Sequence, residues 1–91
     1  MSVQITHVRF ENDYRKTHES ITAYAYKQDA TGAVESKWKA DMVKYLEAGT
    51  TAHVNSGASA VAVAVVNANP KYLRTHANNT WTDNLLSLPT F

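Results

Sequence analysis

Three side chains with binding chemistry alternate along one stretch of the chain. Tyr72, Arg74 and His76 are each two residues apart in "KYLRTH", so a strand would direct all three to one face. An aromatic ring stacks on planar groups, and a guanidinium binds an anion through paired hydrogen bonds. We therefore predict that this row forms a site for a planar, anionic ligand such as a nucleotide.

The neighbouring sequence extends the predicted ligand site. Its further members come from the polar segment after His76 and from a second strand with two tyrosines: Asn79, Thr80, Asp83, Asn84, Tyr24 and Tyr26. A structural interpretation competes with this one and is the stronger of the two. In it the tyrosines pack against the sheet, and Arg74 bonds to Asp83 or to backbone carbonyls.

Motifs for catalysis or metal binding are absent from the sequence. The chain has no cysteine, and its four histidines, His7, His18, His53 and His76, follow no ligand spacing. The three glycines are isolated, and no Gly-x-Ser-x-Gly turn occurs. We predict no catalytic residues, no metal and no cofactor.

Composition narrows the class of protein further. The chain has 91 residues, 44% of them apolar and 19% charged, which suits one folded domain over residues 1–91. A formal net charge of +1 gives no electrostatic reason to bind nucleic acid. The start shows neither a secretory signal nor a membrane-spanning apolar run, so we expect a cytoplasmic protein without membrane attachment.

The elements that must position these residues can be predicted from periodicity. Strands are expected at Val3–Phe10, where a bulge is needed to reconcile two apolar phases, and at Ile21–Tyr26. A helix is expected within residues 35–51, with Ser36 as N-cap, Gly49 after its end, and an apolar stripe of Trp38, Met42, Tyr45 and Leu46. Further strands are expected at Thr51–Asn55, Ser59–Val66 and Lys71–His76. The expected fold class is α+β, with a mostly antiparallel sheet of four to five strands, one amphipathic helix on one face, and the order ββα then ββ or βββ.

The strand at Ser59–Val66 is apolar on both faces, with valines on one side and alanines on the other. We therefore expect both faces to be covered. The helix would cover the valines, against Trp38, Met42 and Leu46. The alanines Ala60, Ala62 and Ala64 would be covered by a second subunit in a homo-oligomer or by the C-terminal segment.

The C-terminal segment carries several large apolar side chains: Leu85, Leu86, Leu88 and Phe91. Thr80-x-x-Asp83 has the form of a helix capping box, and Pro89 ends any helical turn. "TWTDNLLSLP" is thus expected to form a short helical turn that straps leucines onto the sheet or onto a partner.

Two segments, "YLRT" at Tyr72–Thr75 and "DNLLSLP" at Asp83–Pro89, follow a β-rich start of the type "ITHVRF". In these features the chain resembles a family of small bacterial and phage proteins known as a domain of unknown function. The resemblance spans Ile5 to Pro89. It implies architecture and carries no activity and no site residues.

We accordingly expect a small, non-catalytic binding or interaction protein, a homo-oligomer that sequesters an anionic or nucleotide-like ligand. Two alternatives stay open. One is a small enzyme acting on nucleotides or phosphoesters, with His76 and Asp83 as acid and base. The other is an inhibitor that binds a host or phage protein partner through an exposed sheet edge.

Overall fold

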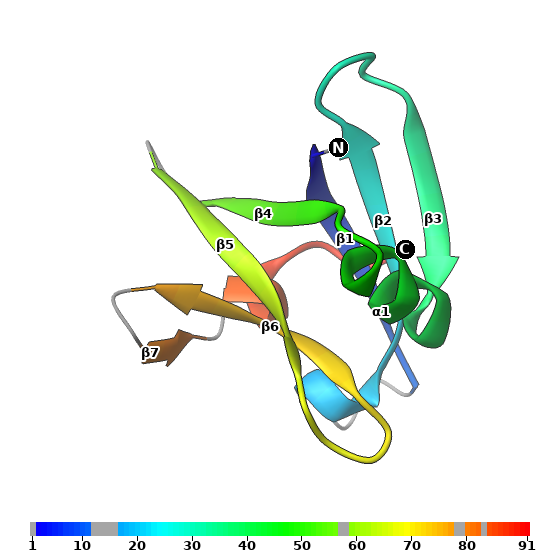
Figure 1. Ribbon diagram of the computed structural model, residues 1–91, viewed down its shortest axis with the longest axis vertical. Coiled ribbons are helices and arrows are strands. Elements are labelled where there is room, and N and C mark those ends of the chain that lie inside the picture. Colours follow the sequence, from blue (N-terminus) through cyan, green and yellow to red (C-terminus); the bar gives the residue numbers. More distant parts are fainter. Residues whose placement is uncertain (1, 12–16, 57–58, 78–79, 83) are drawn as a thin grey trace.

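The computed structural model describes residues 2–11, 17–56, 59–77, 80–82 and 84–91. These residues form a seven-stranded sheet in the order β3-β2-β1-β4-β5-β6-β7, with one α-helix and two short 3-10 helices (Figure 1). The elements, in chain order, are β1 (Ser2–Phe10), η1 (His18–Ser20), β2 (Ile21–Gln28), β3 (Val34–Trp38), α1 (Lys39–Glu47), β4 (Thr51–Ser56), β5 (Ser59–Val66), β6 (Tyr72–Ala77), β7 (Thr80–Thr82) and η2 (Asn84–Ser87).

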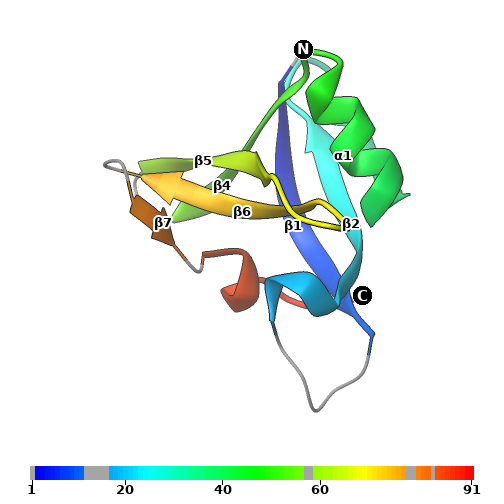
Figure 2. The same ribbon diagram turned by 60° about the horizontal axis from the view of Figure 1, so that its bottom comes forward.

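The sheet folds into two walls around one hydrophobic core. β1 and β4 pair in parallel over only three residues, Ser2–Gln4 with Thr51–His53. Beyond that short contact the β4–β7 wall turns across the β1–β3 wall, as Figure 2 shows. α1 packs against strands of both walls, and η1 and η2 close the opposite side of the core. The walls and these helices together bury the apolar faces that a flat sheet would leave exposed.

The expected α+β fold is wrong, because the described chain is dominated by strands in a mixed sheet. Two elements account for the difference. Val34–Trp38 forms an edge strand paired with β2, whereas a helix was expected to begin there. Thr80–Thr82 adds a short strand beside β6. The parallel contact of β1 with β4 makes the sheet mixed.

The predicted bulge in β1 is confirmed. Ile5 pairs with Tyr26 and His7 with Ala25, so Thr6 is the extra residue. The insertion reverses which side chains face inward, and Val3, Ile5 and Val8 are all fully buried. The apolar side chains before and after the bulge therefore all face the same core.

The helix begins later than expected. Its N-cap is Trp38, which makes no side-chain capping hydrogen bond, and Ser36 lies in β3. Trp38 is 61% exposed and does not belong to the apolar stripe, whereas Met42 is fully buried. The end of the helix was predicted correctly: Gly49 follows the C-cap with φ of 115°, a conformation that favours glycine.

No helix in the described part of the chain is long and apolar enough to span a bilayer.

The expected cover of the β5 alanines by the C-terminal segment is wrong, whereas cover by a second subunit stays a prediction. Val63 is buried, but Ala60 and Ala62 are exposed. The C-terminal leucines do pack on their own chain, with Leu85 fully buried in the core, so they leave the alanines uncovered. Only Asn84–Ser87 of the expected turn is helical, since Thr80–Thr82 is a strand; Asp83 of the expected capping box lies outside the described residues.

Candidate ligand-binding face

The row predicted on β6 lies on the outer face of its wall. Leu73 and Thr75 are fully buried, so Tyr72, Arg74 and His76 alternate to the other side. The paired residues on β5 are Val66, Ala64 and Ala62. The alanines that were expected to be covered therefore form the surface beside this row.

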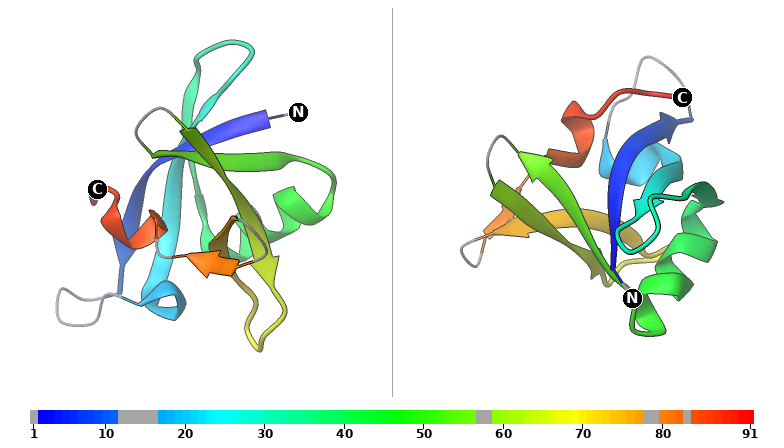
Figure 3. Two further views of the ribbon diagram at one scale, coloured as in Figure 1. Left: turned by 90° about the vertical axis from the view of Figure 1, so that its left-hand side faces the viewer. Right: turned by 90° about the horizontal axis from the view of Figure 1, so that it is seen from above.

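The residues of this surface come from four neighbouring strands. His53 of β4, Ala62 of β5, His76 of β6 and Trp81 of β7 are successive cross-strand partners. The left view of Figure 3 shows β4 to β7 in front of β1 and β2. We call this surface the alanine face and define it by its outward residues: His53, Asn55, Ala60, Ala62, Ala64, Arg74, His76 and Trp81.

Trp81 and His76 form an aromatic pair at one side of the alanine face. Their ring centroids are 4.8 Å apart with an interplanar angle of 67°. This edge-to-face arrangement is a favourable geometry for two aromatic rings. The indole is still 41% exposed. It thus offers an aromatic surface whose position is held by its neighbour.

Arg74 is anchored by its own wall. Its Nε donates to the carbonyl oxygen of Thr82 at 3.1 Å. This contact with a backbone carbonyl agrees with one part of the structural interpretation, and it holds the guanidinium stem beside β7. Tyr72 lies at the opposite end of the row, where its ring stacks on the His18 ring with 6.5 Å between the two ring centroids. The predicted row is therefore divided, with only Arg74 and His76 close to Trp81.

Tyr24 and Tyr26 do not join the alanine face. Both are fully buried in the core on β2. Burial raises the pKa of Tyr24, and the nearby Leu73 backbone only partly opposes this shift. Neither hydroxyl makes a hydrogen bond of ordinary geometry within the described chain. Packing of the tyrosines against the sheet, the structural alternative, is what the fold shows.

Asn84, which is half-buried, is bonded to its own chain. Its backbone N–H donates to Thr75 Oγ1 at 3.1 Å, and Thr82 Oγ1 donates to Asn84 Oδ1 at 2.7 Å. These bonds join β6, β7 and η2. Asn79, Asp83 and the side chain of Thr80 lie outside the described residues. The predicted acid–base pair of His76 and Asp83 therefore stays a prediction.

The strands of the β4–β7 wall carry basic but no acidic residues. Within the bounds of β4, β5, β6 and β7 the sequence contains no Asp or Glu, whereas it contains His53, Arg74 and His76. Asp29 approaches His53 from the turn after β2, with 3.7 Å between Oδ2 and Nδ1. The strands of the alanine face can therefore present positive charge and carry none of the opposite sign. Among the described residues, no three His, Asp or Glu side chains gather as a metal site would require.

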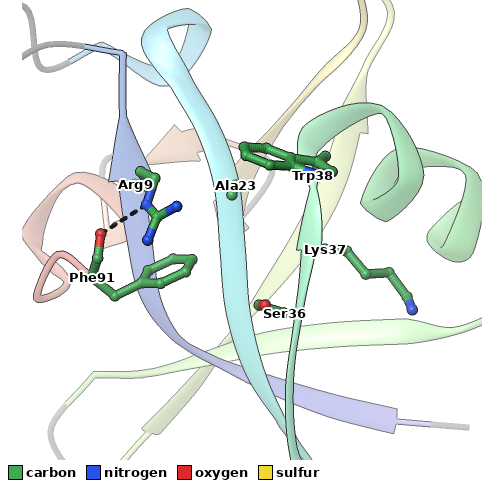
Figure 4. A pocket seen from close by; sticks show the side chains of 6 residues that line it. All are labelled: Arg9, Ala23, Ser36, Lys37, Trp38 and Phe91. Carbon is green, nitrogen blue, oxygen red and sulfur yellow. Dashed lines mark hydrogen bonds between the residues drawn. The ribbon is translucent and has the colours of Figure 1, made fainter.

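Sequence reasoning missed a hollow of ≈ 140 Å³ on the outer face of the β1–β3 wall. Figure 4 shows its lining residues: Arg9, Ala23, Ser36, Lys37, Trp38 and Phe91. Arg9 Nε donates to the Phe91 carbonyl oxygen at 2.9 Å, and the guanidinium lies 4.5 Å from the Phe91 ring centroid. The alternation of "VESKW" was the available signal, but it was assigned to the start of the helix.

Comparison with known proteins supports the resemblance drawn from the sequence. Residues 4–89 match the family described as "Protein of unknown function (DUF3892)". Neither the curated proteins nor the solved structures contain a match. A bacterial or phage origin and the signature formed by Tyr72–Thr75 and Asp83–Pro89 stay predictions. With nearly its whole length covered, the chain belongs to the DUF3892 family.

Proposed function

We propose that this protein is a non-catalytic binding protein that holds a small, planar, anionic ligand, such as a nucleotide, on the alanine face. The observation that carries the proposal is the row His53–Ala62–His76–Trp81, which runs across four strands next to Arg74. It combines an exposed aromatic ring, the Arg74 guanidinium, two imidazoles and an exposed alanine floor. Those are the features that such a ligand requires.

Each part of the face has a distinct role in this proposal. Methyl side chains at Ala60 and Ala62 let a flat group approach the sheet closely. The indole of Trp81 supplies a stacking surface, worth roughly 1–3 kcal/mol for a nucleobase. Arg74 attracts the anionic part of the ligand, and the two imidazoles can donate hydrogen bonds to it.

The two tryptophans, one on each wall, allow the site to be located by fluorescence. Trp38→Phe leaves Trp81 as the only indole, and Trp81→Phe leaves only Trp38. Titration of both variants with adenosine monophosphate is expected to quench the emission of Trp81 in Trp38→Phe. The emission of Trp38 in Trp81→Phe should stay constant.

Two further variants link the quenching to the face itself. Arg74→Gln is expected to weaken binding by about 10- to 150-fold, since a hydrogen bond to a charged group contributes roughly 1.5–3 kcal/mol. Ala62→Leu fills the floor at an exposed position and should abolish binding, while thermal unfolding is unchanged. Equal quenching in both single-tryptophan proteins, or full binding by Ala62→Leu, would contradict the proposal.

A further inference from the structure

β3 forms one outer edge of the sheet, and its exposed side chains are unusual for an edge. Figure 1 shows the strand with β2 on one side and its other side open. Val34 is 72% exposed and Trp38 61% exposed. An edge that carries apolar side chains and unpaired backbone groups is a template for pairing with another strand.

The pairing with β2 determines which backbone groups are available at this edge. Gln28 N–H donates to the Ala33 carbonyl, and Lys27 is the partner of Val34. Because hydrogen-bonded and non-hydrogen-bonded pairs alternate in an antiparallel ladder, Val34, Ser36 and Trp38 direct their N–H and C=O groups away from β2. The Trp38 carbonyl, as the N-cap carbonyl, accepts the first hydrogen bond of α1. The open edge therefore presents three donors and two acceptors, the carbonyl groups of Val34 and Ser36.

The sequence of β3 is self-complementary about its central residue. If a second copy pairs antiparallel with a two-fold axis at Ser36, Val34 lies opposite Trp38 of the second copy. Glu35 lies opposite Lys37 of the second copy. Each pair occurs twice by symmetry, as an isologous interface requires. The same axis places the outward N–H and C=O groups of the two Ser36 residues opposite each other. The register that pairs the side chains therefore also pairs the backbone hydrogen-bonding groups.

We propose that two copies of this chain associate through antiparallel pairing of their β3 strands, centred on Ser36. Four backbone hydrogen bonds result, two from the pair of Ser36 residues and one from each Val34–Trp38 pair, in which the Trp38 N–H donates to the Val34 carbonyl. Val34 and Trp38 make apolar contacts on one face of the joined sheet, and Glu35 and Lys37 make ion pairs on the other. This proposal is independent of the ligand proposed for the alanine face.

The contacts already made within the chain hold both charged residues on the required face. Gln28 Nε2 donates to Glu35 Oε1 at 3.0 Å, and Lys37 Nζ lies 4.9 Å from the Tyr45 ring centroid. Proximity of the Tyr26 hydroxyl, outside ordinary hydrogen-bond geometry, raises the pKa of Lys37. Figure 4 shows Lys37 on the opposite side of β3 from Ser36 and Trp38.

Charge exchange tests this pairing directly. Glu35→Lys alone places two lysines opposite each other, and Lys37→Glu alone places two glutamates opposite each other. Each single variant is expected to raise the dimer dissociation constant about tenfold or more, since directly opposed like charges destabilise a strand pair. An equimolar mixture of the two variants, and the double variant Glu35→Lys/Lys37→Glu, should each dimerise like the original chain.

Sedimentation equilibrium over a wide range of concentrations provides the measurement. Lys44→Glu, a charge change on the exposed side of α1, is the matched control and should dimerise normally. Ser36→Pro removes the central outward N–H without removing a bond to β2 and should yield a monomer of unchanged thermal stability. A monomeric original chain, or a mixture of the two charge variants that does not associate, overturns the proposal. A dimer that is insensitive to all of these changes overturns it as well.

Discussion

β2 and β5 both carry alternating alanines on an outward face, and their surroundings differ completely. Ala23 and Ala25 of β2 are only 4% and 8% exposed. Ala60 and Ala62 of β5 are exposed. Ala23 is enclosed by long side chains from β1, β3 and the C-terminal residues, namely Arg9, Trp38 and Phe91. The strand with the more apolar sequence is therefore the less covered one.

This contrast teaches that the neighbours of a strand decide its burial, and its own composition does not. The segment after η2 runs along β1, where Val8 donates to the Pro89 carbonyl and Phe91 donates to the Val8 carbonyl. It consequently covers the first wall and cannot reach the alanines of β5. The sequence "SAVAVAVV" reports that both faces tolerate apolar contact, but it does not identify what supplies that contact.

The largest effect is expected for Leu85→Ala. Leu85 enters the core from η2, so its truncation should reduce the free energy of unfolding by about 2–5 kcal/mol. Urea denaturation followed by circular dichroism measures this loss. A change below roughly 1 kcal/mol would mean that the leucine lies on the outside, as it would if the segment covered β5.

A matched pair of charge insertions tests the contrast itself. Ala25→Asp places a carboxylate in a covered position and should cost roughly 1–3 kcal/mol. Ala62→Asp makes the same change at an open position, with an expected effect within about 0.5 kcal/mol. The urea midpoints of both variants give the two losses of stability. Equal losses would show that the two alanine rows are equally buried.

Alkaline pH should act on the covered strand through Tyr24. The unfolded phenol loses its proton near pH 10, whereas the folded one keeps it because burial raises the pKa of Tyr24. Stability from this group is complete below about pH 10 and falls by about 1.4 kcal/mol per pH unit above it. The slope of the unfolding free energy between pH 9 and pH 11, measured in urea, should flatten in Tyr24→Phe.

Phe91→Ala is expected to have the smallest effect. The ring is 40% exposed and contributes mainly its contact with the Arg9 guanidinium, worth about 0.5–1 kcal/mol at such a site. Hydrogen exchange should show faster exchange at Ala23 and Ala25, with no change in β5. Faster exchange in β5 would mean that the C-terminal residues cover the β4–β7 wall instead of the β1–β3 wall.

Local patterns predicted those features that depend on one strand alone. The bulge at Thr6 follows from the two apolar phases of β1, and the outward row on β6 follows from simple alternation. The start of the helix could not be predicted in this way, because Val34–Trp38 becomes a strand only through its pairing with β2. The sequence of that segment is compatible with either state.

The candidate site shows the same limit. Alternation separated Tyr24 and Tyr26 from Ala23 and Ala25, but it could not tell which side of β2 faces the core. Arg74 and His76 were placed correctly on one surface, whereas Trp81 joined them only because β7 pairs with β6. Cross-strand register is a long-range property, and a single sequence without pairing partners does not determine it.

The bridge between Val8 and Thr90 has a consequence for synthesis on the ribosome. Part of β1 gains its second neighbour only when residues near position 90 have left the exit tunnel. Until then the nascent chain exposes the backbone groups at that side of β1 and lacks Leu85 in its core. The final packing of β1 therefore has to wait for the segment around position 90, and a chain stalled before η2 should be open to chaperones and proteases.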